Sequence, residues 1–193
     1  LKTRGRRAHS AVPEMGQNAI EAMLRLLLGF TGNIAGWGNG TVYNIRDLAG
    51  YPGGFIVPDI CESWLDVHLP PSASIDAVKQ RLRRFMKQAA TDIPGLDASL
   101  EFANTYAGYR IDDDDPLLAL LKKTFEPLSL PWAPQDFRSH SDGNLLFAAG
   151  VLPVIVGPGR LEAAHTPDEA VDFQEVVRAA QLYLALTSSL GED

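Results

Sequence analysis

The chain has 193 residues, of which 46% are hydrophobic and 21% charged, as is typical of a globular protein with one domain or one and a half. Its formal net charge of -7 and pI near 5.0 argue against a nucleic-acid-binding protein, which would present a basic face. The chain has one cysteine, Cys61, which excludes an internal disulfide. The longest apolar cluster, residues 24–28, is too short for a membrane span. We therefore expect a cytoplasmic protein without a membrane partner.

The first block, residues 1–111, alternates strand and helix patterns. Strand patterns cover residues 1–9, 41–45, 60–69 and 96–106. Helix patterns cover residues 18–30 and a segment that Ser74 caps, with apolar positions at Ile75, Val78, Leu82, Phe85 and Ala89. The order strand, helix, strand, strand, helix, strand predicts an α+β, ferredoxin-like fold, in which two helices cover one face of a four-stranded antiparallel sheet.

The second block, residues 112–193, predicts an incomplete α/β layer. Asp115-Pro116 is a typical helix start, residues 142–149 indicate a short helix, and Asp172 with Glu175 resembles the capping box of a last helix. Residues 151–156 predict a single apolar strand of a parallel sheet. Because one strand cannot satisfy its own edges, we expect its partner strands to come from elsewhere.

Among the four histidines, His165 is the best candidate for a metal ligand. It stands in a polar loop between Gly157-Pro158-Gly159 and the acidic pair Asp168-Glu169. The alternative interpretation is a surface histidine near a helix start. His9 and His68, judged by their own surroundings, are also expected at the surface.

Residues 139–144 place a serine, a histidine and an aspartate next to one another. Neighbours along the chain do not form a catalytic triad, whose members meet through the fold. Two interpretations stay open: Ser141 or Asp142 caps a helix, or the segment contacts a substrate. The acidic run 112–115 lacks the ligand spacing of a calcium loop and indicates a solvated helix start.

Four separated segments carry a family resemblance over the length of the chain. They are GRRAHSAVPEMGQNAI at residues 5–20, GFIVPD with LDVHLPP at 54–59 and 65–71, SHSDGN at 139–144, and VIVGPG with AHTPDE at 154–159 and 164–169. In order and spacing they resemble the M20 metallopeptidases, which include acetylornithine deacetylases, succinyl-diaminopimelate desuccinylases, aminoacylases and glutamate carboxypeptidases. The resemblance implies a dimerisation domain at residues 1–111 and an incomplete closing piece of the zinc-peptidase catalytic domain at 112–193.

The resemblance also implies roles for particular residues. His165 matches the last ligand of a two-zinc site, and His9 matches a histidine that reaches into the partner subunit's active site and donates to the substrate carbonyl and the oxyanion. Gly157, Pro158 and Gly159 match a loop that lines the substrate pocket, and Ser141, Asp142 and Asn144 match a segment near it. Phe55 and His68 differ from the asparagine and arginine that are frequent in the family, so the usual recognition of a substrate carboxylate is not implied.

In the family, two metal ions polarise an amide carbonyl and activate a bridging water, and a glutamate takes the proton. The remaining metal ligands and that glutamate belong to an N-terminal half that these 193 residues do not contain. A catalytic zinc needs about three protein ligands. We therefore expect two zinc ions per subunit in the full-length parent, no tightly bound zinc in this chain, and no activity of the chain by itself.

The sequence thus predicts part of a homodimeric amidohydrolase that cleaves an N-acyl or peptide amide of a small amino-acid-like substrate. One alternative is a non-catalytic, self-associating module. Another is a ferredoxin-like regulatory domain that binds an amino acid, although such a domain does not account for residues 139–169.

Overall fold

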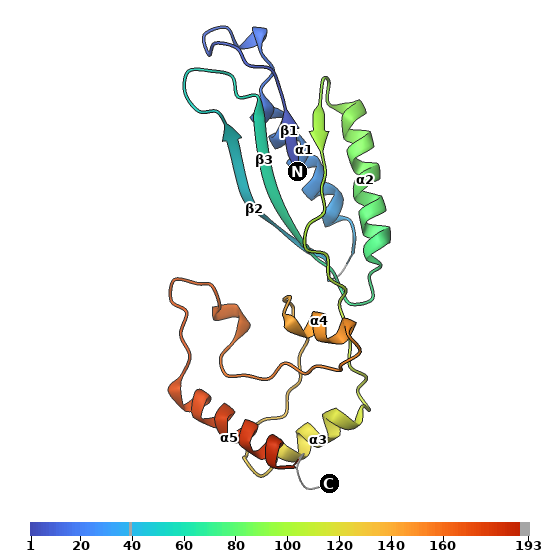
Figure 1. Ribbon diagram of the computed structural model, residues 1–193, viewed down its shortest axis with the longest axis vertical. Coiled ribbons are helices and arrows are strands. Elements are labelled where there is room, and N and C mark those ends of the chain that lie inside the picture. The colour runs from blue at the N-terminus through green and yellow to red at the C-terminus, as the bar shows by residue number, and fades with distance from the viewer. Residues whose placement is uncertain (39, 190–193) are drawn as a thin grey trace. The chain divides into compact units, whose positions relative to one another are not determined.

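The computed structural model of the chain describes residues 1–38 and 40–189 (Figure 1). The chain divides into two compact units, Leu1–Tyr109 and Arg110–Asp193. Elements of the first unit are β1 (Lys2–Arg4), a 3-10 turn (Pro13–Met15), α1 (Ala19–Ala35), β2 (Val42–Tyr51), β3 (Ile60–His68), α2 (Ile75–Asp92) and β4 (Asp97–Ser99). Their order is the one that the sequence predicts.

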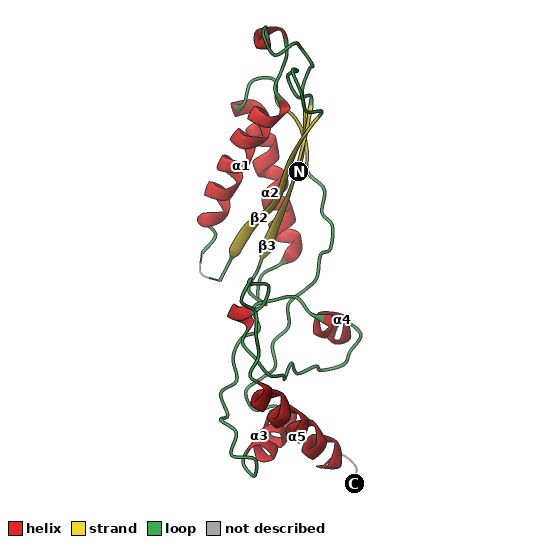
Figure 2. Cartoon of the chain, turned by 90° about the vertical axis from the view of Figure 1, so that its left-hand side faces the viewer, coloured by secondary structure: helices red, strands yellow, loops and turns green. Residues whose placement is uncertain are grey.

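The four strands form one sheet in the order β2-β3-β1-β4, and every neighbouring pair is antiparallel. Helices α1 and α2 lie on the same side of this sheet (Figure 2). Both helices begin at a side-chain cap: the Asn18 carboxamide accepts from the backbone N–H groups of Ile20 and Glu21, and the Ser74 hydroxyl accepts from that of Ala77. The α+β, ferredoxin-like prediction is confirmed.

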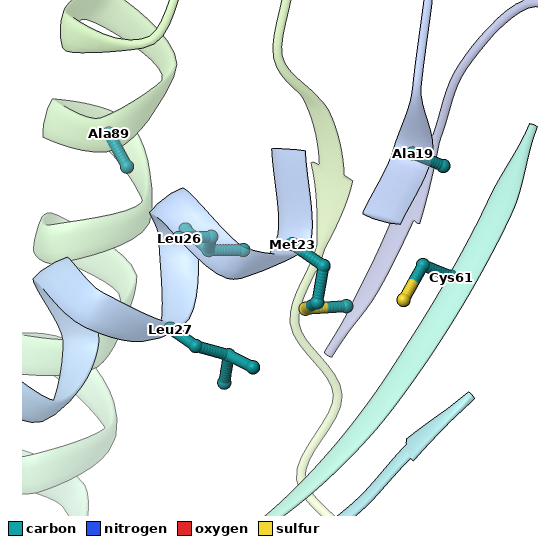
Figure 3. Packing of buried hydrophobic residues seen from close by; sticks show 6 residues of the cluster. All are labelled: Ala19, Met23, Leu26, Leu27, Cys61 and Ala89. Atoms are coloured by element: carbon teal, nitrogen blue, oxygen red, sulfur yellow. The ribbon is translucent and has the colours of Figure 1, made fainter. Parts of the chain in front are cut away.

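The core of the first unit lies between the sheet and the helices. One cluster joins α1 to β3 and α2 and consists of Ala19, Met23, Leu26, Leu27, Cys61 and Ala89 (Figure 3). In it the side chains of Met23 and Cys61 point toward each other. The buried Thr3 hydroxyl ties β1 to α1 by donating to the Ala19 carbonyl at 2.7 Å. Burial, and to a lesser extent the Glu62 charge, raises the pKa of the Cys61 thiol.

The opposite face of the sheet is charged. Lys2 pairs with Glu62 across β1 and β3, with Nζ and Oε1 2.7 Å apart. The hydrogen bond from Lys2 holds the pKa of the Glu62 carboxyl below its usual range. The Arg46 guanidinium lies 3.4 Å from Asp66 and stacks 5.0 Å above the centre of the Trp64 ring. Alternation along β3 accounts for both faces, because Cys61 and Ser63 are buried whereas Glu62 and Trp64 are exposed.

The last strand is shorter than the sequence predicts. Only Asp97–Ser99 pairs with the three residues of β1, whereas the alternating pattern extends over 96–106. Leu100 and Phe102 still pack against the core cluster of Phe30, Ile34 and Leu82, and Lys79 and Arg83 lie over the Phe102 ring. The alternating pattern therefore indicates which side chains are buried, and the ladder of hydrogen bonds ends at Ser99, before the pattern does.

The second unit is helical in its described part. Its elements are α3 (Pro116–Phe125), α4 (Asp142–Ala148), a 3-10 turn (Leu161–Ala163) and α5 (Phe173–Ser189). As predicted, Pro116 opens α3, and the Asp115 carboxylate accepts from the Leu117 N–H at 2.8 Å. The strand predicted at residues 151–156 does not form, because nothing in the described part of the unit pairs with this segment.

The second unit also buries little of itself. Among its described residues, those that are buried are Leu121, Thr124, Gly143 and Leu182. Large apolar side chains at its surface include Leu145, Leu146, Val151, Ile155, Val171, Phe173, Val176 and Leu184. The described residues of this unit therefore leave a large apolar surface exposed. No helix in the described residues is long and apolar enough to cross a bilayer.

Candidate functional site

His9 is carried by a loop that rises between β1 and α1. The residues on either side of it are hydrogen-bonded to the segment that precedes β3: the Ala8 carbonyl accepts from the Val57 N–H at 2.9 Å, and the Ser10 N–H donates to the Phe55 carbonyl at 3.0 Å. His9 thereby faces Ile56 in an isolated antiparallel bridge. Its imidazole is exposed, and its Nδ1 accepts from the Ala11 backbone N–H at 3.1 Å.

The base of this loop is closed by further contacts. Arg6 and Gln17 exchange both backbone hydrogen bonds, at 2.9 and 2.8 Å. The Arg7 Nε lies 2.9 Å from Oδ2 of Asp59, a residue whose side chain is only 23% exposed. The sequence identifies the segment that contains Asp59, but the ion pair depends on two segments that meet only in the folded unit.

His165 occupies an unusual backbone conformation in the second unit. Its φ of 62° lies in the left-handed region, which is uncommon for a residue with a side chain. The Glu169 carboxylate holds this turn by accepting from the His165 N–H at 2.8 Å, and the Thr166 hydroxyl donates to the Ala163 carbonyl at 2.7 Å. The imidazole itself is exposed. A strained residue whose side chain faces solvent is a reasonable candidate for a functional one.

Gly157, Pro158 and Gly159 form an exposed loop that α5 holds at two points. The Glu175 carboxylate accepts from the Gly159 N–H at 2.9 Å, and the Tyr183 hydroxyl donates to the Val156 carbonyl at 2.8 Å. The predicted capping box of α5 is thus only half right. Asp172 does accept from the Gln174 N–H, but the Glu175 side chain bonds to the loop.

Ser141 is the N-cap of α4. Its hydroxyl accepts from the Gly143 N–H at 3.2 Å, and the Asn144 side chain accepts from the Ser141 N–H at 3.1 Å, which completes a capping box. Asp142 is exposed in the first turn of the helix. The cap, one of the two interpretations that the sequence leaves open, is therefore formed. It does not conflict with a contact between this segment and a substrate.

The side chains that the structure describes do not make a metal centre by themselves. Within residues 1–38 and 40–189, no three histidine, cysteine, aspartate or glutamate side chains are placed to hold one metal ion. His165 offers one imidazole, and the neighbouring Glu169 carboxylate is already bonded to backbone. A hydrolytic zinc site takes about three protein ligands, so the residues present do not fit a complete one.

Two further positions of interest lie apart from these groups. Phe55 is 85% exposed at the turn that faces the His9 loop. His68 ends β3, is exposed, and stands opposite Val42 in the ladder.

Comparison with known proteins identifies the first unit. Residues 1–93 match the M20 family described as the peptidase dimerisation domain. The chain is 27% identical over 198 residues to the uncharacterized protein YqjE of Bacillus subtilis (strain 168). It is 23% identical over 210 residues to N-formyl-4-amino-5-aminomethyl-2-methylpyrimidine deformylase of Halalkalibacterium halodurans and 24% identical over 184 residues to acetylornithine deacetylase of Vibrio atlanticus.

These alignments cover nearly all of this chain but a part of each relative. They include 94%, 94% and 90% of the chain and 48%, 48% and 47% of the relatives, in the order given, so the chain spans about half the length of the curated relatives that it matches.

The solved structures that the chain matches are also covered over about half of their length. The chain superposes on AtUAH in complex with glyoxylate with a TM-score of 0.80 at 16% identity, covering 100% of this chain and 46% of that one. For a tripeptidase from Staphylococcus aureus the TM-score is 0.75 at 21% identity, covering 100% and 50%. At such identities the likeness shows the shared fold. The resemblance to M20 peptidases is confirmed.

Proposed function

We propose that this chain, whose residues 1–93 are an M20 peptidase dimerisation domain, is the C-terminal half of a metal-dependent amidohydrolase. The substrate is an N-acyl or peptide amide of a small amino-acid-like molecule. The observation that carries the proposal is the pair of alignments that place 94% and 90% of the chain within about half of a deformylase and of a deacetylase. Both units of the chain, and not the dimerisation domain alone, therefore correspond to parts of such hydrolases.

In this proposal His165 gives one imidazole to a metal centre whose other donors lie outside the chain. Its exposed ring and its left-handed backbone, held by Glu169, support that role. Bound zinc would supply a Lewis acid for the amide carbonyl. Because the described residues do not provide the three ligands that a catalytic zinc needs, the chain alone binds no zinc tightly and hydrolyses nothing.

The first unit provides self-association through its edge strand. Strand β2 ends the sheet, and an edge strand offers unpaired backbone groups to another chain. Tyr43, Ile45 and Leu48 lie on its helix-facing side, because they stand opposite Val67, Leu65 and the buried Ser63, yet each is 40–46% exposed. Leu24 and Leu28 of α1 are 45% and 75% exposed. We name these five residues the α1–β2 surface and propose that a second copy covers it.

His9 acts across that dimer. We propose that its imidazole enters the active site of the partner subunit and donates a hydrogen bond to the substrate carbonyl, which becomes the oxyanion of the transition state. The ring is exposed, while the residues on both sides of it are hydrogen-bonded to the 55–57 segment. Gly157, Pro158 and Gly159 line the pocket, and Ser141, Asp142 and Asn144 lie near it.

A non-catalytic self-associating module is the second candidate. It is favoured by the extent of the family match, which ends at residue 93 and so lies wholly within the first unit.

The test extends the coding sequence upstream of Leu1 and assays the complete protein. We expect an upstream half with a His-x-Asp pair and a later Glu-Glu pair, and hydrolysis of N-acetyl amino acids with zinc or cobalt. His165→Ala should abolish turnover, whereas Glu162→Ala, at an exposed position three residues earlier, should leave it unchanged. A start codon directly before Leu1, or turnover by the purified 193-residue chain, would overturn the proposal.

A further inference from the structure

We infer that the first unit presents His9 as a hydrogen-bond donor with its proton on Nε2, and that the Ala11 N–H and the Arg7–Asp59 ion pair are the groups that position it. The inference rests on the proposed function of His9 and specifies how that residue acts. It excludes a role for the neutral ring as a general base toward substrate.

The proton position follows from the partner of Nδ1. The Ala11 backbone N lies 3.1 Å from Nδ1, and a backbone N–H can only donate. Nδ1 must therefore accept and carries no proton. In a neutral imidazole the proton then sits on the other nitrogen, so Nε2–H is the group that remains for a ligand. A ring with both nitrogens protonated would lose the bond from Ala11.

The backbone on both sides of His9 is fixed as well. The bonds from Val57 to Ala8 and from Ser10 to Phe55 flank the His9–Ile56 bridge, so these two residues form a non-hydrogen-bonded pair of an antiparallel ladder. Residues paired in this way extend their side chains to the same face. The ladder fixes the direction in which the ring leaves the chain, and the Ala11 N–H fixes its rotation. Such preorganisation is what a donor to a developing oxyanion requires.

The Arg7–Asp59 ion pair fastens the loop where it leaves the sheet. Arg7 follows β1 by three residues, Asp59 directly precedes β3, and the Asp59 carbonyl also accepts from the Gly5 N–H at 2.8 Å. The second carboxylate oxygen, Oδ1, is buried and has no hydrogen-bond partner among the residues that the structure describes. Arg7 is thus the cation that compensates a largely buried charge, and its removal leaves that charge unpaired.

An Nε2–H donor and a general base are different chemical roles. A base needs a nitrogen lone pair directed at the proton to be taken. In His9 the free lone pair is directed at Ala11, within the protein. The outward-facing group can only give a hydrogen bond, which suits a carbonyl oxygen that gains negative charge.

The tautomer is measured directly by long-range proton–nitrogen correlation of the imidazole rings in the 15N-labelled 193-residue chain at neutral pH. His9→Gln identifies the His9 signals among the four histidines, and the exposed His68 serves as an internal reference. We expect a single Nε2–H tautomer for His9. Ala11→Pro, which removes the N–H, should convert it to a mixture, and Ala11→Gly, which keeps the N–H, should not. A mixture in the unsubstituted chain, or no change in Ala11→Pro, would overturn the inference.

The positioning role of Arg7 and Asp59 has its own readout. In Arg7→Ala and Asp59→Asn, amide hydrogen exchange at Ser10 and Val57 should accelerate at least about tenfold, while the buried Leu26 amide of α1 keeps its rate. Arg7→Lys should restore most of the protection because it returns the cation. Equal exchange at Ser10 and Val57 in all of these chains would show that the ion pair positions nothing.

The two proposals fail separately. A single Nε2–H tautomer combined with a complete protein that cleaves no amide would sink the proposed hydrolase and leave the inference about the loop intact. If His9 is a mixture of tautomers but the complete protein hydrolyses amides and His165→Ala abolishes that activity, the inference about the loop fails and the proposed hydrolase stands.

Discussion

Leu28→Ser should weaken self-association without unfolding the first unit. Leu28 is 75% exposed on α1, so the fold depends little on it, whereas a partner that covers the α1–β2 surface would bury it. Full burial of a leucine side chain contributes about 1.5–3 kcal/mol, and three-quarters of that range is roughly 1–2 kcal/mol. A two-fold interface repeats the loss in both copies, so the dissociation constant should rise by about 30- to 1000-fold.

Sedimentation equilibrium over a dilution series measures this change, and urea unfolding of the same sample checks the fold. Trp64→Ser is the matched control, because it removes a large apolar side chain that is 49% exposed on the opposite face of the sheet, outside the α1–β2 surface. Its dissociation constant should equal that of the unsubstituted chain. If Leu28→Ser dissociates no more readily than the control, or if the unsubstituted chain is monomeric at high concentration, the α1–β2 surface is not the interface.

Three other substitutions or reactions test the structure itself. A Cβ at Gly5 would collide with the Gln17 carbonyl, so Gly5→Ala should lower the free energy of unfolding by about 1–3 kcal/mol in urea titrations. In the same titrations Gly32→Ala should raise the free energy of unfolding by up to about 1 kcal/mol, because a Cβ at this position of α1 meets nothing. In thermal unfolding, His165→Gly should be about 1 kcal/mol more stable than His165→Ala. Both variants lack the imidazole, and only alanine keeps a Cβ at a φ of 62°. Equal stabilities of the two variants would mean that the turn is not strained. Cys61 should react with a thiol reagent at pH 8 only as fast as the unit opens, because its sulfur is buried. Burial also raises the pKa of the thiol, so the reactive thiolate is scarcer than in a free cysteine. A rapid phase of the reaction in the native chain would contradict the burial of Cys61.

The order of elements in the first unit could be predicted because each element carries its own period. Ser74 marks the start of α2, and apolar positions such as Leu82 and Ala89 mark its buried face. The limits of the strands could not be predicted in the same way. Whether residues 100–106 join the ladder depends on a neighbouring strand, and the sequence of the segment reports only which side chains are buried. The same reason explains residues 151–156, whose apolar pattern needs a partner strand to become a strand.

For the predicted site, the sequence indicates candidate residues but not the contacts that position them. His165 could be selected as a candidate from its residue type and its loop, and His9 from the family resemblance, but the groups that hold them could not be predicted. Glu169 and Glu175 bond to backbone N–H groups of the His165 turn and the Gly159 loop, and those partners are set by the fold. Asp59 meets Arg7 only because β1 and β3 are neighbours in the sheet. Any residue with a carboxylate can make such contacts, so its type alone does not reveal the partner.

The two histidines differ in what they depend on. The contacts that fix His9 come from Ala11, the 55–57 segment and the Arg7–Asp59 ion pair, all within a unit that has its own apolar core. His165 holds a strained backbone in a unit that buries little of itself, and strain of this kind persists only where the surroundings enforce it. The inferred tautomer of His9 should therefore be found in the 193-residue chain by itself. The proposed metal binding at His165 should appear only in a complete protein, in which the proposed N-terminal half covers the apolar surface of the second unit. A chain that bound zinc tightly through His165 without that half would contradict this dependence.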